Sequence, residues 1–187
     1  MIDTKQRILD SAMRLVQSHS YAGFSFQDIA DEVGIRKASI YSHFRSKEEL
    51  AERVLQEARY FFESEISPLT EERVEVQLDS YLGLFRRVFS GGERMCPGGS
   101  FAAVWSSISP SLQAAVQDFT EFHLTLIEGI LRRGRDLGSF KANGQTPGQQ
   151  ALLILSNIEG AVLMARITGK SRVLDTAIDQ IKAQVLA

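Results

Sequence analysis

Apolar residues recur every three or four positions along almost the whole chain, and this spacing predicts helices throughout. Two short apolar stripes cover residues 3–18 and 25–33, and a third short helix follows the break at Gly34. Longer stripes cover residues 46–66, 71–89, 109–137 and 146–168, with shorter helices at 100–107 and from residue 171 onward. No segment alternates with a period of two for long enough to predict a strand. The predicted fold class is all-α.

The segment from residue 25 to residue 47 has the pattern of a helix-turn-helix. Ser25 stands at an N-cap position with Asp28 three residues on, which resembles a capping box. Gly34 interrupts the first helix, and a second helix resumes with Ile40 and Phe44 as its apolar contacts. The second helix of such a motif can lie in the major groove of DNA. Residues 35–47 carry no acid and four cations, which supports DNA binding: Arg36, Lys37, Arg45 and Lys47.

A second capping box predicts how the motif joins the rest of the chain. Ser46 and Glu49 open a helix that runs to about residue 66, and a helix of about twenty residues spans about 30 Å. Such a helix can belong to a small N-terminal bundle at one end and to a second body at the other. We therefore predict a helix-turn-helix DNA-binding domain over residues 1–50 and a second helical domain over residues 51–187.

Composition agrees with a globular protein that binds DNA locally. The net charge is −2, and a sequence-specific binder needs only a local cationic face. Cys96 is the single cysteine, so no internal disulfide can form and a reducing cytoplasm is the expected location. The first ten residues carry charges and lack the apolar run of a signal peptide. Polar residues interrupt the most apolar stretch, 151–167, so no membrane span is expected.

The N-terminal motif combines a fixed set of residues: Ile29, Ala30, Val33 and Gly34, followed by Ser39, Ile40, Tyr41, His43, Phe44, Ser46, Lys47 and Leu50. This pattern resembles the TetR/AcrR family of bacterial transcriptional regulators. The resemblance implies a three-helix DNA-binding bundle joined by a long helix to an all-helical effector-binding and dimerisation domain, here residues 51–187. It also implies a homodimer that binds double-stranded operator DNA, usually as a repressor, and is released by a small-molecule effector.

The resemblance assigns DNA-contacting roles around the second helix of the motif. Arg36 stands where the family more often has a small hydroxyl residue, and its guanidinium could pair with a guanine. Lys47 matches a position that binds the DNA backbone. The alternatives are plain surface charge for Arg45 and Lys47 and a packed structural role for His43. The expected DNA-binding residues are Ser25, Gln27, Arg36, Lys37, Ala38, Ser39, Tyr41, Ser42, His43 and Lys47.

The middle of the chain is rich in aromatic residues and is the expected effector region. A ligand pocket needs apolar walls with a few polar groups, and an aromatic stripe at helical spacing can equally be plain core. The expected pocket residues are Phe85, Phe89, Phe101, Trp105, Phe119, His123, Asn157 and Glu159. Cys96 lies beside Arg94 near a helix start, an environment that favours the reactive thiolate. A thiol sensor of oxidants or electrophiles is thus an alternative to a simple ligand sensor.

Small and apolar residues in the last two helices predict a dimer interface, with burial inside the subunit as the alternative. The expected interface residues are Ile154, Gly160, Ala161, Leu163, Ala165 and Ile178. A small helical enzyme is the rival class of function. The three histidines have no metal-ligand spacing, and neither a phosphate-binding loop nor a reason to assemble a catalytic triad is present. We therefore expect no catalytic residues, no metal and no cofactor.

Overall fold

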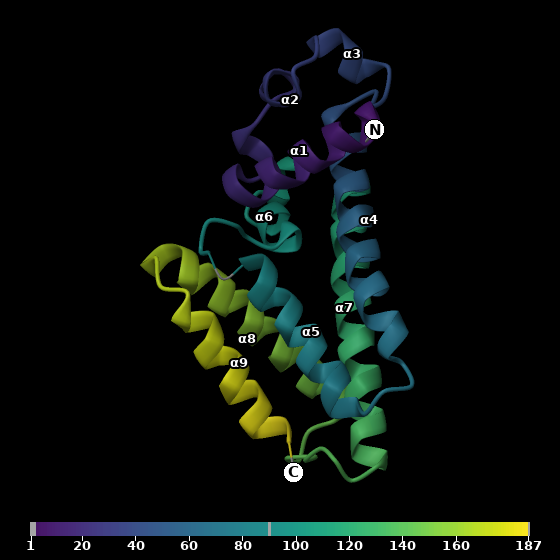
Figure 1. The fold of residues 1–187 in the computed structure, drawn as a ribbon, viewed down its shortest axis with the longest axis vertical. Coiled ribbons are helices and arrows are strands. Elements are labelled where there is room, and N and C mark those ends of the chain that lie inside the picture. The colour runs from purple at the N-terminus through teal and green to yellow at the C-terminus, as the bar shows by residue number, and fades with distance from the viewer. Residues whose placement is uncertain (1–2, 90, 187) are drawn as a thin grey trace. The chain divides into compact units, whose positions relative to one another are not determined.

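The computed structural model describes residues 3–89 and 91–186. This part of the chain is all helix, apart from turns and an isolated antiparallel bridge between Phe140 and Leu186. The fold-class prediction is confirmed (Figure 1). The longer helices are α1 (Thr4–His19), α2 (Phe26–Val33), α4 (Lys47–Ile66), α5 (Val74–Phe89), α7 (Pro110–Asp136), α8 (Pro147–Thr168) and α9 (Arg172–Val185). The short ones are η1 (Tyr21–Gly23), α3 (Lys37–Tyr41), η2 (Ser67–Leu69), α6 (Pro97–Ala102) and η3 (Trp105–Ser107).

The chain forms two compact units, each with its own contacts. The first unit contains the residues up to 59 together with 95–119, and the second contains 60–94 together with the residues from 120 onward. The first unit thus combines the helix-turn-helix with α6, although these segments are far apart in the sequence. The predicted domain boundary near residue 50 remains a prediction.

The core of the first unit follows the predicted apolar stripes. Ile8, Ile29 and Ile40 are inaccessible to solvent, and Val33 and Phe44 are nearly so, whereas Leu15 is half-buried. Gly34 ends α2 in the left-handed conformation, with φ of 74°, which a residue with a Cβ rarely adopts. The chain can therefore turn sharply between α2 and α3.

Hydrogen bonds at the helix starts explain where α2 and α4 begin. The Ser25 side chain and the Asp28 carboxylate form a complete capping box at α2. At α4 the Glu49 amide donates to the Ser46 hydroxyl at 3.0 Å, while the Glu49 carboxylate accepts from the Arg45 amide at 2.8 Å. Both helices thus begin within a residue of their predicted starts.

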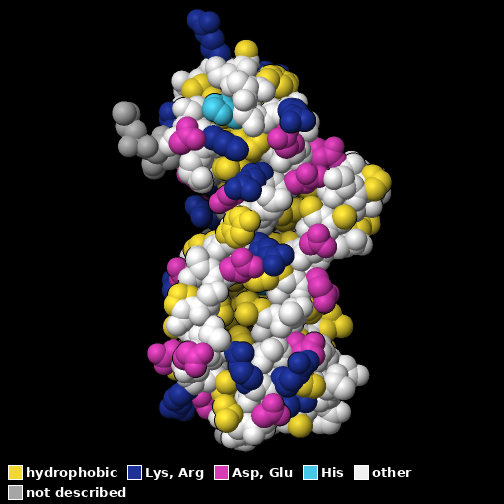
Figure 2. Space-filling view, turned by 90° about the vertical axis from the view of Figure 1, so that its right-hand side faces the viewer, with side chains coloured by type: hydrophobic (Ala, Val, Ile, Leu, Met, Phe, Trp, Pro, Cys, Tyr) yellow, Lys and Arg dark blue, Asp and Glu magenta, His cyan; other side chains and the backbone are white. Residues whose placement is uncertain are grey.

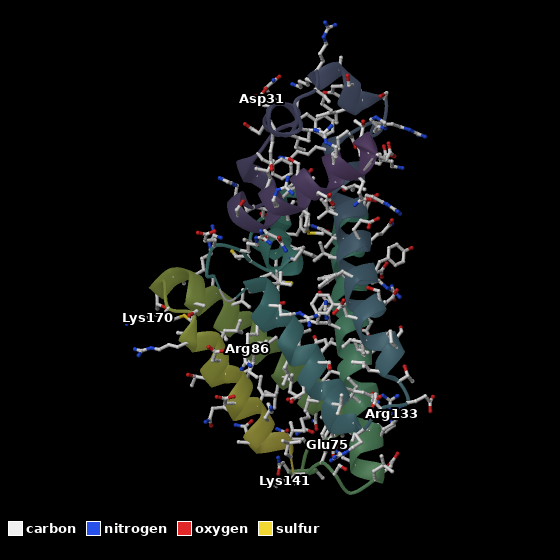
Figure 3. All side chains as sticks on the ribbon, in the orientation of Figure 1. Asp31, Glu75, Arg86, Arg133, Lys141 and Lys170 are labelled. Atoms are coloured by element: carbon white, nitrogen blue, oxygen red, sulfur yellow. The ribbon has the colours of Figure 1, made fainter. Side chains whose placement is uncertain are left out.

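The second unit is held together by packed helices with ion pairs at their edges. Helices α8 and α9 lie side by side, and α9 also contacts α5. Arg86 of α5 lies between α5 and α9 (Figure 3), where its Nε is 2.7 Å from the Asp175 carboxylate. Lys182 of α9 pairs with Asp79 of α5 at 2.6 Å. These pairs are partly exposed, so each adds at most about 1 kcal/mol to a fold held mainly by apolar burial.

Helix α8 differs from the other helices because it is apolar on opposite faces. Its inward face buries Ile154, Ile158 and Ala165. By length and composition alone this helix could cross a membrane, a test that the core helices of soluble proteins also pass. Its outward face carries exposed apolar side chains at Leu152, Leu153, Leu163, Met164 and Ile167.

Candidate DNA-binding surface and effector region

The predicted recognition segment presents mostly exposed side chains over a buried base. Ile40 is the buried residue of α3, and Arg36 occupies its N-cap position. The exposed residues are Arg36, Lys37, Ala38, Tyr41, Ser42 and Arg45, while Ser39 and His43 are half-buried. Figure 2 shows Lys and Arg side chains interspersed with acidic ones over the face that it draws, so positive charge does not cover the protein. The cations of residues 36–45 form a local feature of the first unit.

Residues at the start of α2 use their polar groups within the helix. The Ser25 hydroxyl accepts from the Gln27 amide and donates to Asp28. Hydrogen bonds from the Ser25 hydroxyl and amide hold the pKa of Asp28 below its ordinary value. The Gln27 side chain donates to Asp31 at 2.8 Å, and Figure 3 shows Asp31 on the outer side of α2. Ser25 and Gln27 are exposed but already have local partners.

The predicted contact residues of α3 and α4 differ in their surroundings. Tyr41 is 53% exposed, and its ring packs edge-on against Phe26 with 5.2 Å between centroids. The Ser42 hydroxyl donates to the Ser39 carbonyl at 2.7 Å. Lys47 is half-buried, and its ammonium donates to the backbone carbonyls of Tyr21 and Phe24. Lys47 therefore has partners in its own subunit, unlike the exposed cations of α3.

Side chains from α1 hold α2 in place behind this surface. The Ser11 hydroxyl donates to Glu32 at 2.7 Å, and Arg14 pairs with the same carboxylate. Arg7 donates to the Val33 carbonyl at the end of α2, where helix carbonyls lack partners within the helix. These contacts connect α1 to both the middle and the end of α2.

Three of the predicted pocket residues lie together in the second unit: His123, Phe85 and Phe89. The His123 ring is buried against Phe62, at 4.6 Å, and Phe85, at 6.0 Å, with Phe89 next to Phe85. The Tyr81 hydroxyl lies 3.0 Å from His123 Nδ1. Burial in this apolar cluster lowers the pKa of His123 to about 3, so the imidazole is neutral at physiological pH.

Three further predicted pocket residues belong to the first unit. The Phe101 ring lies 5.4 Å from the Tyr21 ring, and Phe119 packs against Gly98 of α6. A Cβ at Gly98 would lie 3.3 Å from the Phe119 ring, so a glycine favours this close approach. Trp105 is 37% exposed at the start of η3.

The polar pocket candidates of α8 lie outside the His123 cluster. Asn157 lines two open grooves between α8 and α9, of about 240 and 660 Å³. Glu159 is half-buried on α8. Cys96, the candidate sensor thiol, is 3% exposed at the N-cap position of α6. Within the described residues, no group of three or more His, Cys, Asp and Glu side chains is arranged to hold a metal ion.

Four of the predicted interface residues are buried inside the subunit. Ile154, Ala161, Ala165 and Ile178 face the packing of α8 with its neighbours, because they lie on the inward sides of α8 and α9. Gly160 is exposed, and Leu163 is 43% exposed. The burial of these four agrees with the alternative of packing inside the subunit, and the dimer interface remains a prediction.

Sequence reasoning missed several residues that the structure brings into these regions. Phe62 and Tyr81 complete the His123 cluster. Tyr81 belongs to the aromatic-rich middle of the chain but is not among the expected pocket residues, and helical spacing alone does not show where either side chain points. Tyr21 and Phe24 surround Lys47, at the other end of the helix-turn-helix in sequence. Residue spacing alone contains no signal for this last contact, because it joins positions more than twenty residues apart.

Comparison with known proteins agrees with the helix-turn-helix and with the helices that follow it. Residues 8–54 match the model of bacterial regulatory proteins of the tetR family, and residues 70–181 match the tetracyclin repressor-like C-terminal domain. The HTH-type transcriptional repressor DhaR of Mycobacterium sp. (strain GP1) is 24% identical, with 91% of this chain and 86% of DhaR covered. The IcaR negative regulator of the biofilm operon icaADBC in Staphylococcus aureus (strain Newman) is 32% identical over 48% of each chain.

A solved structure extends the similarity to the whole fold. The TetR transcriptional regulator from Legionella pneumophila superposes with a TM-score of 0.87 at 28% identity, covering 99% of this chain and 98% of that one. The second family model alone spans more than half of the chain, and the predicted resemblance is confirmed. The chain belongs to the TetR family of transcriptional regulators.

Proposed function

We propose that this protein is a homodimeric repressor that binds a palindromic DNA operator and is released by a small-molecule effector. The observation that carries the proposal is the exposed cationic surface of α3 over a buried helix-turn-helix core. The names of DhaR and IcaR, a repressor and a negative regulator, support repression as the direction of control. We propose that it acts in the cytoplasm as a regulator, the class that the names of its relatives give, and not as an enzyme.

In this proposal α3 enters the major groove, and its side chains contact both base edges and phosphates. Arg36, at the N-cap of α3, can pair with the two acceptors of a guanine. Lys37 and Arg45 are exposed and can neutralise phosphates. Tyr41 is held by Phe26 at its ring, which leaves its hydroxyl available for a phosphate.

The outward face of α8 supports dimerisation. Leu152, Ser156, Gly160, Leu163 and Ile167 recur at helical spacing, so they share one face, with the half-buried Glu159 at its edge. Burial of a leucine-sized side chain stabilises an interface by about 1.5–3 kcal/mol. A contiguous exposed apolar face of this kind marks an interaction site, and a twofold axis lets one face cover its own copy.

The His123 cluster supports an apolar or aromatic effector. Its aromatic members are Phe62, Phe85 and Phe89, and its polar groups are the Tyr81 hydroxyl and a neutral imidazole. A neutral imidazole offers a hydrogen bond but no charge to attract an anion. The dimer must have two arrangements, one that fits the operator and one that does not. The effector releases DNA only if it binds the second arrangement more tightly, because a ligand with equal affinity for both changes neither population.

The thiol-sensor alternative has less support. Cys96 is 3% exposed, and a sensor thiol must be accessible to its oxidant or electrophile. We therefore propose that the effector binds at the aromatic cluster of the second unit. The corresponding division of labour is DNA binding by residues 1–50 and effector binding with dimerisation by residues 51–187.

Selection of bound DNA from a random pool tests the proposal. We expect an inverted repeat whose half-site centres lie about 34–36 Å apart or at a multiple of that distance. On the selected site, Arg36→Ala should relax the base preference at one position of each half-site. Lys37→Met should weaken binding to all sites and reduce the slope of log K against log salt by about 1. Failure to enrich any inverted repeat contradicts the proposal.

A further inference from the structure

A groove of about 240 Å³ lies where the first half of α8 packs beside the end of α9 and the loop that precedes α8. The groove belongs wholly to the second unit, and the residues that line it are not those of the His123 cluster. Sites for drug-sized ligands occupy about 300–1,000 Å³. This groove therefore suits a smaller molecule.

The groove has apolar walls and a set of amide side chains. Helix α8 contributes Leu153 and Ile154 to the walls, and α9 contributes Ile181 and Val185. A small ring can pack between these two aliphatic walls. None of the described residues that line the groove is charged, and the polar ones all carry amides: Asn143, Gln145, Gln150, Asn157 and Gln184.

Gln150 is the buried member of this set, with 4% of its surface exposed. Its Oε1 accepts a hydrogen bond from Arg135 Nη2 at 2.6 Å, which fixes the orientation of the amide and leaves Nε2 as the remaining donor. Among the described residues, none accepts a hydrogen bond from Gln150 Nε2. A carbonyl oxygen of a ligand in the groove can accept this bond.

The loop at this end of the groove is held in place by the protein itself. Arg135 Nη1 donates to the Gln145 carbonyl at 2.6 Å, and Nη2 donates to the Ala142 carbonyl at 3.3 Å. Asn143 Nδ2 donates to the Gln184 carbonyl at 2.7 Å, which joins the loop to the end of α9. The groove is thus formed without a ligand, which lowers the cost of ordering on binding.

Amides lie at both ends of the apolar strip that α8 contributes. Gln150 and Asn157 are seven residues apart, so they share one face of α8 at about 10 Å along its axis, with Leu153 and Ile154 between them. A primary amide both donates and accepts hydrogen bonds. The two ends therefore complement an uncharged molecule that has an apolar middle and an amide at each edge.

We propose that this groove binds a small uncharged cyclic amide, of the class of lactams and cyclic dipeptides. Its ring packs between α8 and α9, and its amide edges pair with Gln150 at one end and Asn157 at the other. The site is distinct from the effector region proposed around His123, and the proposal does not depend on DNA binding.

Calorimetric titration of the full chain with the cyclic dipeptide cyclo(glycyl-glycyl) tests the proposal. We expect saturable binding of one molecule per subunit. The matched probe is cyclo(sarcosyl-sarcosyl), which keeps the ring and both carbonyls but has a methyl group in place of each N–H. It should bind about tenfold or more weakly, because the amides at the ends of the groove lose their donor partners.

Two variants and a matched control locate the probe in the groove. Gln150→Glu keeps an oxygen acceptor for Arg135 but replaces the Nε2 donor with a second acceptor, and it should weaken binding about tenfold or more. Asn157→Leu removes the exposed amide at the other end and should also weaken binding about tenfold. Gln149→Glu makes the same chemical change outside the lining, at a capping-box position that glutamate suits, and should bind the probe as wild type does.

Circular dichroism of the three variants checks that the helices remain, and if Gln150→Glu does not fold, Asn157→Leu decides. Absence of saturable binding of cyclo(glycyl-glycyl) overturns the proposal. Wild-type affinity in both Gln150→Glu and Asn157→Leu overturns it too, because the probe then binds elsewhere, and so does an equal loss in Gln149→Glu. Tighter binding of an uncharged polyol such as xylitol overturns the amide class. None of these measurements uses DNA, so failure of the proposed repressor function is recognised separately.

Discussion

His123 should make the stability of the protein fall as the pH decreases from neutral to 5. Its pKa is about 3 in the folded protein, against an ordinary value of 6.5, because burial penalises the charged imidazolium. Between pH 6.5 and 3, His123 therefore binds a proton in the unfolded chain but not in the folded protein. Stability from this group is complete above pH 6.5 and is lost progressively as the pH falls through that window.

The size of the effect follows from the two pKa values. One pKa unit corresponds to about 1.36 kcal/mol, so at pH 5.0, which lies 1.5 units below 6.5, the loss is about 2 kcal/mol. For a chain of this length, that loss lowers the melting temperature by about 4–8 °C. Both values assume one titrating group and a constant protein concentration, since a dimer's stability depends on concentration.

Urea unfolding followed by circular dichroism at pH 7.5, 6.5 and 5.0 measures this effect. His123→Gln can still hydrogen-bond to the Tyr81 hydroxyl but cannot titrate, so its stability should fall by about 2 kcal/mol less than that of wild type over this range. The exposed His19 provides the matched control, and His19→Gln should follow the wild-type pH dependence. Parallel curves for wild type and His123→Gln would refute the reasoning, since they would mean that burial does not keep the imidazole neutral.

Two further predictions concern the dimer and the thiol. Leu163→Glu should weaken dimerisation about thirtyfold or more by placing a charge in an apolar interface. Leu137→Glu makes the same change at a more exposed leucine outside α8, 71% exposed against 43%, and should leave the dimer intact. Analytical ultracentrifugation measures both dimer constants, and equal values would exclude the α8 face. Because Cys96 is buried, it should react with Ellman's reagent only after unfolding. Cys96→Ser should keep the full effector response in a reporter assay. Rapid labelling of the native protein, together with a lost response in the variant, would instead support the thiol sensor.

The helices and the helix-turn-helix were predictable because their determinants are local. Ser25 with Asp28 and Thr146 with Gln149 form capping boxes within four residues, and both boxes are present in the structure. The apolar stripes of α1 and α2, which contain Ile8 and Ile29, likewise define buried faces by spacing alone. The short helix predicted over 100–107 is instead α6 over Pro97–Ala102 followed by the turn η3, because Pro97 is compatible with a first helical turn.

Tertiary structure alone decided which apolar residues are buried and what each polar residue contacts. On α8, Ile154 and Leu163 are equally apolar in sequence, but only the packing of α8 against its own subunit buries the first and exposes the second. Lys47 belongs to the same run of cations as Lys37, yet only the fold brings Tyr21 and Phe24 around its ammonium. The physical reason is that periodicity reports on neighbours within a turn or two of helix, whereas burial and charge pairing depend on segments that meet only after folding.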